Sequence, residues 1–195
     1  MKRSDLDRDA GYILDAIKAR DYEIPTNSQI LKIIFSKLII VYALQISFIV
    51  LDFILNTGSY GYHFFDTFVL AVGSNLFFSL AFLMTTYSAV CMNLIMGEEI
   101  RKQSMLLQII DKKVRFYSCL LVFINTVIGI ILLWAGERFV AGLGFSWFAT
   151  FLVSSLLLQG SMSRYMTPAV VSSLSKVREL VSGNAVTTED SNKGT

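Results

Sequence analysis

The chain has 195 residues, of which 54% are hydrophobic and 16% are charged, whereas soluble domains carry roughly 25% charged residues. Its net charge of +2 is modest, and we expect no nucleic-acid partner. One histidine and two cysteines cannot form a Cys/His zinc site, so we expect neither a metal nor a cofactor. These features predict an all-α integral membrane protein.

Residues 1–29 form a polar N-terminal segment of mixed charge. An amphipathic helix is predicted from about Ser4 to Arg20, before Pro25 and Asn27 break the pattern. Its apolar face comprises Leu6, Ile13, Leu14 and Ile17. This helix could lie on the membrane surface, pack on a neighbouring helix, or belong to a domain outside this chain.

Residues 30–163 form the predicted transmembrane region. Its longest apolar run, from Thr67 to Gly97, contains no Asp, Glu, Lys, Arg or His, and about 20 helical residues suffice to cross a bilayer. The pattern predicts an all-α fold of two helical hairpins. Their four spans lie at about 33–55, 66–96, 116–135 and 139–161.

The connector at 97–115 is expected to be one helical extension that protrudes from the membrane, because Glu98–Arg115 contains no helix breaker and Glu98 and Lys102 form a supportive i,i+4 pair. Apolar side chains available for packing there are Ile100, Leu107 and Ile110. In the tail at 164–195, Thr167–Pro168 predicts a helix start, with disorder beyond a short helix that ends near Val181. That helix would pack through Val170, Leu174 and Val177.

Two further features concern the second hairpin. Trp134 and Trp147 bracket its short turn and are predicted to lie at the membrane interface. Gly142 and Ser146 form a small-xxx-small pair that would permit a close helix approach.

Positive charge predicts the orientation. Of the 17 Lys and Arg residues, only Arg138 falls in a predicted exterior turn. The others precede the first span or lie at its start, as Lys37 does, or they occupy the connector or follow the last span. By the positive-inside rule, both termini and the connector are therefore expected in the cytosol.

No hydrolase, metalloprotease or P-loop motif occurs, and we expect no enzyme. The candidate site residues are therefore the polar residues within and beside the spans. Those inside the spans either bond neighbouring helices or line a ligand pocket; they are Gln45, Asn75, Asn93, Asn125 and Gln159. Those at the predicted outer boundary are Asp52, His63 and Asp66. We expect this second group to be hydrated, although such groups can also line an ion or proton path.

Two stretches carry a family resemblance, DYEIPTNSQILKIIFSKLIIVYALQISFIVLDFIL from Asp21 and FFDTFVLAVGSNLFFSLAFLMTTYSAVCMNLI from Phe64. They resemble part of the insect gustatory receptor family, whose members have seven spans and a cytosolic N-terminus. On that alignment the four spans correspond to the third to sixth of the family. The family's signature in the last span, Thr-Tyr followed by apolar residues and Gln-Phe, does not occur, so the resemblance is to a partial or truncated member and implies no pore residue here.

The resemblance implies a chemoreceptor subunit of a ligand-gated cation channel in the plasma membrane, with a role in taste signalling. Such a protein would bind a small apolar ligand and assemble with itself or with other membrane proteins. Two other functions stay open. One is a non-enzymatic four-span adaptor, assembly or trafficking protein, in any cellular membrane. The other is a small transporter, although the two hairpins show no repeat at the residue level.

Overall fold

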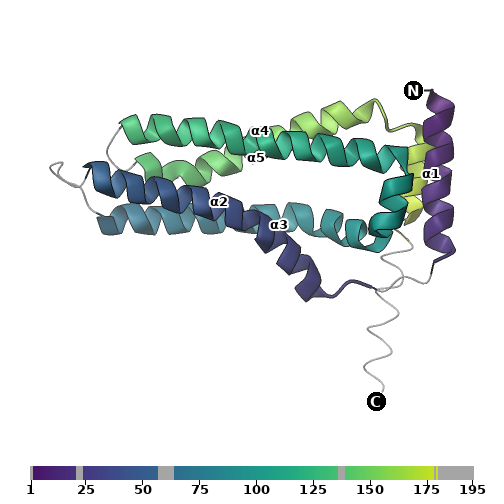
Figure 1. Cartoon of the computed structure of the whole chain (residues 1–195), viewed down its shortest axis with the longest axis horizontal. Coiled ribbons are helices and arrows are strands. Elements are labelled where there is room, and N and C mark those ends of the chain that lie inside the picture. Colours follow the sequence, from purple (N-terminus) through teal and green to yellow (C-terminus); the bar gives the residue numbers. More distant parts are fainter. Residues whose placement is uncertain (1, 21–23, 57–63, 136–138, 178, 180–195) are drawn as a thin grey trace, which may run out of the picture.

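The computed structural model describes residues 2–20, 24–56, 64–135, 139–177 and 179, and every element that it defines there is a helix. The long helices run side by side, and the N-terminal helix crosses one end of them (Figure 1). The elements are α1 (Arg3–Lys18), α2 (Asn27–Asn56), α3 (Phe64–Gln103), α4 (Met105–Ala135), the 3-10 helix η1 (Phe139–Gly142) and α5 (Leu143–Ser163). Residues 168–177 form a further short helix.

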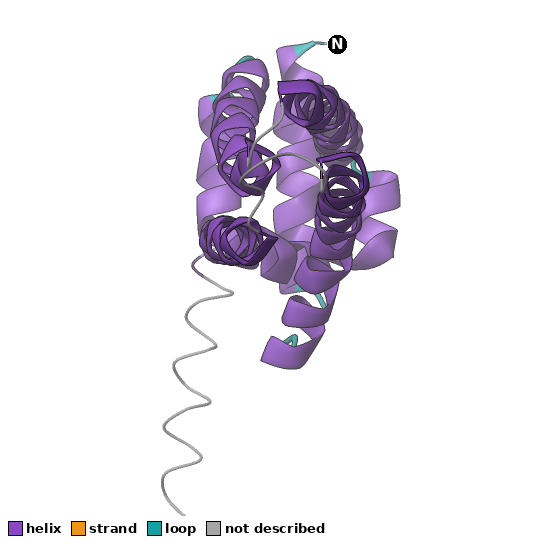
Figure 2. Ribbon diagram, turned by 90° about the vertical axis from the view of Figure 1, so that its left-hand side faces the viewer, coloured by secondary structure: helices purple, strands orange, loops and turns teal. Residues whose placement is uncertain are grey.

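Four helical stretches within the described residues are long and apolar enough to cross a membrane: 27–55, 68–103, 105–135 and 139–163. In the most apolar 18-residue segment of each stretch, only 11% to 33% of the residues are buried, so most of this apolar surface faces outward. Met84 is 78% exposed and Leu156 is 67% exposed. Soluble proteins do not expose this much apolar surface to water, whereas the lipid chains of a membrane can cover it. Figure 2, seen from the end opposite α1, shows these helices grouped around a common axis.

One end of the bundle is closed by what we call the basal layer: α1, residues 97–110 and residues 164–177. Their apolar side chains form one core, separate from the core between the long helices. Its buried members are Leu6, Ala10, Ile13, Ile17, Met96, Ile100, Leu106, Leu107, Val170 and Val177. The three segments that positive charge assigns to one side of the membrane therefore meet in one structure.

The amphipathic N-terminal helix is confirmed, and it packs on neighbouring helices. The predicted helix start at Thr167 is also confirmed, because its Oγ1 accepts a hydrogen bond from the Val170 amide at 3.3 Å. Thr167 also donates to Asp7 of α1, which joins the tail to the N-terminal helix. Arg20 and Glu99 add an ion pair of 3.0 Å between the N-terminal segment and α3.

The expectation of one unbroken helical connector at 97–115 is wrong. Gly97 has a left-handed backbone (φ 64°), and the chain turns again at Ser104 before α4 begins. The Asp9 carboxylate of α1 stabilises this second break, because it accepts hydrogen bonds from the Ser104 hydroxyl at 2.8 Å and from the Leu106 amide at 2.7 Å. A carboxylate at a helix N-terminus satisfies free amides and is favoured by the helix dipole.

Two expectations about the second hairpin also fail. Trp134 is 90% exposed, as an interfacial residue should be, but Trp147 is fully buried against Phe78. The cause is η1, whose Val140 and Ala141 are buried, so that the chain already lies inside the bundle when α5 begins.

The close helix approach is made by Gly144, since a Cβ on Gly142 would meet nothing within 4 Å. A Cβ on Gly144 would lie 2.4 Å from the Ser74 Oγ and 2.7 Å from its backbone carbon. This contact brings α5 directly against the backbone of α3.

Candidate functional site

A layer of polar side chains crosses the bundle about one third of the way from the end opposite the basal layer. Gln45 lies 11 residues before the end of α2, Asn75 lies 11 residues after the start of α3, and Asn125 lies 10 residues before the end of α4. At a rise of about 1.5 Å per residue, each is some 15 to 17 Å from the end opposite the basal layer. We call these three residues the amide layer. They bring three of the predicted site residues to one level of the bundle.

Gln45 and Asn75 join α2 to α3. The Asn75 Nδ2 donates to the Ala71 carbonyl at 2.8 Å and also to the Gln45 Oε1. Because the carbonyl can only accept, the Asn75 amide is fixed in this orientation, and Gln45 must present its oxygen. The Gln45 Nε2 and the Asn75 Oδ1 are then buried without a hydrogen-bond partner among the described residues.

Two hydroxyl groups extend this contact, and the sequence reading missed them. Tyr42 of α2 and Ser79 of α3 share a hydrogen bond. The Ser79 hydroxyl donates to the backbone carbonyl of Asn75 at 2.7 Å. Helical spacing could have found them, because Tyr42 lies three residues before Gln45 and Ser79 lies four residues after Asn75.

Asn125 has a different environment although it is equally deep in the bundle. It is 0% exposed, its Nδ2 donates to the Leu121 carbonyl at 2.9 Å and the Thr150 hydroxyl at 2.7 Å, and its Oδ1 accepts from Ser146 at 3.0 Å. Asn125 is thus a fully bonded link between α4 and α5. It provides an internal standard against which the incomplete bonding of Gln45 and Asn75 can be judged.

Aromatic side chains pack between α3 and α5 next to this layer. Phe78, three residues after Asn75, lies 6.1 Å from the Trp147 ring and 6.0 Å from the Phe151 ring, between ring centroids. The Trp147 Nε1 is another buried donor without a partner in the described part of the chain. Unpaired donors and acceptors beside aromatic rings are the usual elements of a site for a small, largely apolar molecule.

The other predicted site residues lie elsewhere. Asn93 and Gln159 are exposed on the outer surface of α3 and α5. Asp66 is exposed, as expected, but Asp52 is only 1% exposed, so its expected hydration is wrong. The register explains this, because Asp52 lies seven residues, or two turns, after the buried Gln45 and on the same face of α2. His63 lies outside the described residues.

Carboxamides donate and accept hydrogen bonds but do not ionise near neutral pH, so the amide layer is suited to binding rather than to acid–base chemistry. Among the described residues, no group of three or more His, Cys, Asp or Glu side chains could hold a metal ion.

Composition, helix length and the apolar outer surface together define the class of this protein, a multi-pass membrane protein with four membrane-spanning helices among its described residues. No family model, no curated protein and no solved structure matches the chain.

Proposed function

We propose that this chain is a chemoreceptor-like membrane protein that binds a small, mostly apolar molecule at the amide layer. In this proposal it corresponds to part of a gustatory-receptor-like, ligand-gated cation channel subunit, and it resides in the plasma membrane. The observation that supports binding best is the incomplete bonding of Gln45 and Asn75. A polar pair that only held two helices together would be expected to satisfy itself, as Asn125 does.

The unpaired groups indicate which chemistry a ligand needs. The Gln45 Nε2 offers a donor and the Asn75 Oδ1 offers an acceptor, so a hydroxyl or carboxamide on the ligand could bond to both. The neighbouring aromatic rings of Phe78 and Trp147 favour an apolar body. Receptors for such molecules gain specificity from a few polar contacts inside an apolar site.

Ligand-dependent thermal stabilisation of the purified chain tests this proposal. A panel of small molecules, each with an apolar body and one hydroxyl or carboxamide, is screened against the wild type, Asn75→Leu and Asn93→Leu. A ligand at 100 times its dissociation constant adds about 2.7 kcal/mol to the stability of the bound state. We expect hits that stabilise the wild type and Asn93→Leu but not Asn75→Leu, since Asn93 is on the same helix and is exposed. Equal stabilisation of both variants would reject a site at the amide layer.

A channel function needs a second measurement, because binding alone does not move ions. Cells that express the chain are exposed to a hit from the screen, and the cation current across their plasma membrane is recorded. A current that requires both the ligand and Asn75 supports the receptor proposal. Binding without current in any subunit combination would separate the binding site from the channel hypothesis.

The second candidate is a non-enzymatic adaptor or assembly factor, and the basal layer favours it. This layer holds three polar segments in one rigid surface through Asp9, Asp7 and Arg20. Light scattering of the detergent-solubilised chain distinguishes the two, with protein mass read separately from detergent. A discrete tetramer favours the receptor, whereas a uniform monomer or dimer favours the adaptor.

A further inference from the structure

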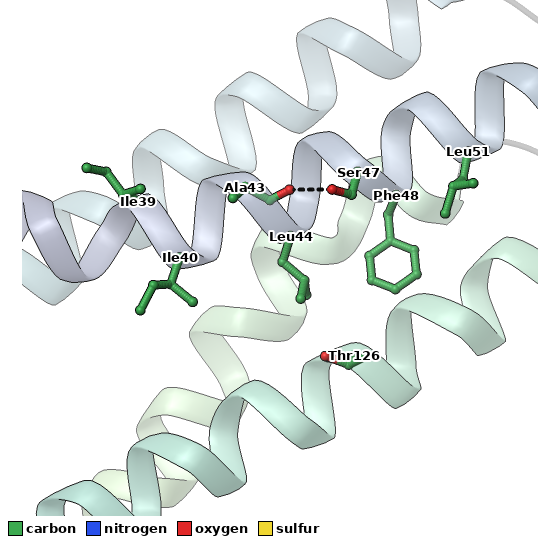
Figure 3. A pocket seen from close by; sticks show the side chains of 8 residues that line it. All are labelled: Ile39, Ile40, Ala43, Leu44, Ser47, Phe48, Leu51 and Thr126. Atoms are coloured by element: carbon green, nitrogen blue, oxygen red, sulfur yellow. Dashed lines mark hydrogen bonds between the residues drawn. The ribbon is translucent and has the colours of Figure 1, made fainter.

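A lateral groove of about 500 Å³ lies between α2 and α4 on the outer surface of the bundle. Figure 3 shows Ile39, Ile40, Leu44 and Leu51 projecting from α2 around it, with Thr126 on α4. The two hydroxyl groups in its wall bond within their own helices, Ser47 to the Ala43 carbonyl and Thr126 to the Val122 carbonyl, each at 2.8 Å. The groove therefore offers an occupant apolar contacts and no free hydroxyl hydrogen.

The groove is narrower at one end than at the other. Phe48 of α2 narrows it on the side away from the basal layer, because its ring packs so tightly on α4 that a Cβ on Gly129 would lie 2.5 Å away from it. Towards Ile39 the two helices are further apart than they are beside Leu51 (Figure 3). The wider end thus faces the end of the bundle that carries the basal layer.

Each wall carries a cation in line with the groove at this wider end. Lys37 lies seven residues before Leu44 on α2, and Arg115 lies eleven residues before Thr126 on α4. Two and three helical turns place each cation on the same stripe as its groove residue. Both side chains are exposed, and neither forms an ion pair with another described residue.

We propose that the groove binds an anionic phospholipid, with one acyl chain between α2 and α4 and the headgroup against Lys37 and Arg115. Long cationic side chains reach the headgroup level from inside a span, and basic pockets between helices on the cytosolic side select anionic lipids. A helix from a second copy would also fill the groove but would leave both cations without a counter-charge. This inference does not depend on the chemoreceptor proposal.

Lys18 provides the control because it is an exposed cation of the basal layer. It lies on α1, which contributes no residue to the groove. Affinity is measured by native mass spectrometry of the full chain in neutral detergent, titrated with phosphatidylserine and with phosphatidylcholine of the same acyl chains. We expect phosphatidylserine to bind more tightly, with Lys37→Gln and Arg115→Gln each weakening it about fivefold and the double variant about 25-fold. Lys18→Gln should leave the affinity unchanged.

A second pair of variants tests the acyl-chain contact. Ala43→Phe fills the groove from α2, whereas Ile46→Phe adds a ring to an exposed position that does not line it. We expect only Ala43→Phe to weaken both lipids, with unchanged helicity by circular dichroism. The proposal is overturned if the two lipids bind equally, if Lys18→Gln acts like Lys37→Gln, or if Ala43→Phe instead dissociates a dimer of the chain.

Discussion

Asp9 is predicted to hold the start of α4 in place, and its removal should loosen the basal layer. Its carboxylate accepts hydrogen bonds from the Ser104 hydroxyl and from the amides of Met105 and Leu106, at 2.8, 3.2 and 2.7 Å. Removing the carboxylate from the first two amides of α4 costs about 1 kcal/mol. Leaving the buried Ser104 hydroxyl hydrogen without an acceptor costs about 1 to 3 kcal/mol, although the hydroxyl oxygen still accepts from the Leu107 amide at 3.2 Å. Asp9→Ala should therefore destabilise the local structure by about 2 to 4 kcal/mol.

Hydrogen exchange measured by mass spectrometry detects such a local opening. Since about 1.4 kcal/mol corresponds to a factor of ten, exchange at residues 104–110 should accelerate by roughly 30- to 700-fold in Asp9→Ala. Asp15→Ala is the matched control, because Asp15 is an exposed carboxylate on the same helix. Equal exchange in the two variants would refute the role given to Asp9, whereas acceleration confined to Asp9→Ala would support it.

Three further predictions concern the interior of the bundle. Gly144→Ala should lower thermal stability by about 1 to 3 kcal/mol, because the added Cβ meets the backbone of Ser74, whereas Gly160→Ala should have little effect since its Cβ meets nothing within 4 Å. Asn125→Leu should lower the free energy of unfolding by about 1 to 3 kcal/mol, because it loses the hydrogen bonds to Thr150 and Ser146. Asn93→Leu, at an exposed position, should lower it much less. Equal losses for the two variants in chemical unfolding would count against the α4–α5 link. Brominated lipids should quench the fluorescence of Trp147→Phe, which retains the exposed Trp134, far more than that of Trp134→Phe, and the opposite order would show that Trp147 is not buried.

Local features of the sequence were sufficient where the signal and its cause lie close together in the chain. The apolar period of α1, the long uncharged runs and the Thr167–Pro168 helix start are of this kind, and the structure has the corresponding helices. In each case hydrogen bonds and burial within about one to three turns decide the conformation.

Structural features that depend on contacts between distant residues could not be predicted from local sequence patterns. The break at Ser104 contains neither Gly nor Pro. Ser104 caps α4 locally, since its hydroxyl accepts from the Leu107 amide at 3.2 Å, but the first two amides of α4 bond to Asp9, which is 95 residues from Ser104 in the chain. The burial of Trp147 follows from the inward path of η1, which by composition is part of the apolar stretch 139–163. Asn75 and Asn125 are the same residue type at the same depth, yet only tertiary contacts determine that one is fully bonded and the other is not.

The central claim is that the polar segments before, between and after the two hairpins form one layer on the cytosolic side of the membrane. The most direct test is the accessibility of single cysteines to a membrane-impermeant thiol reagent in intact cells, after Cys91 and Cys119 have been replaced. Cysteines at Lys18, Lys102 and Lys176 sample the three segments of the basal layer, and cysteines at Ser59 and Glu137 sample the two predicted exterior turns. The first three should react only after the cells are opened, and the last two should react in intact cells. Reaction of any of the first three from outside would contradict the claim, because the basal layer cannot form across a bilayer.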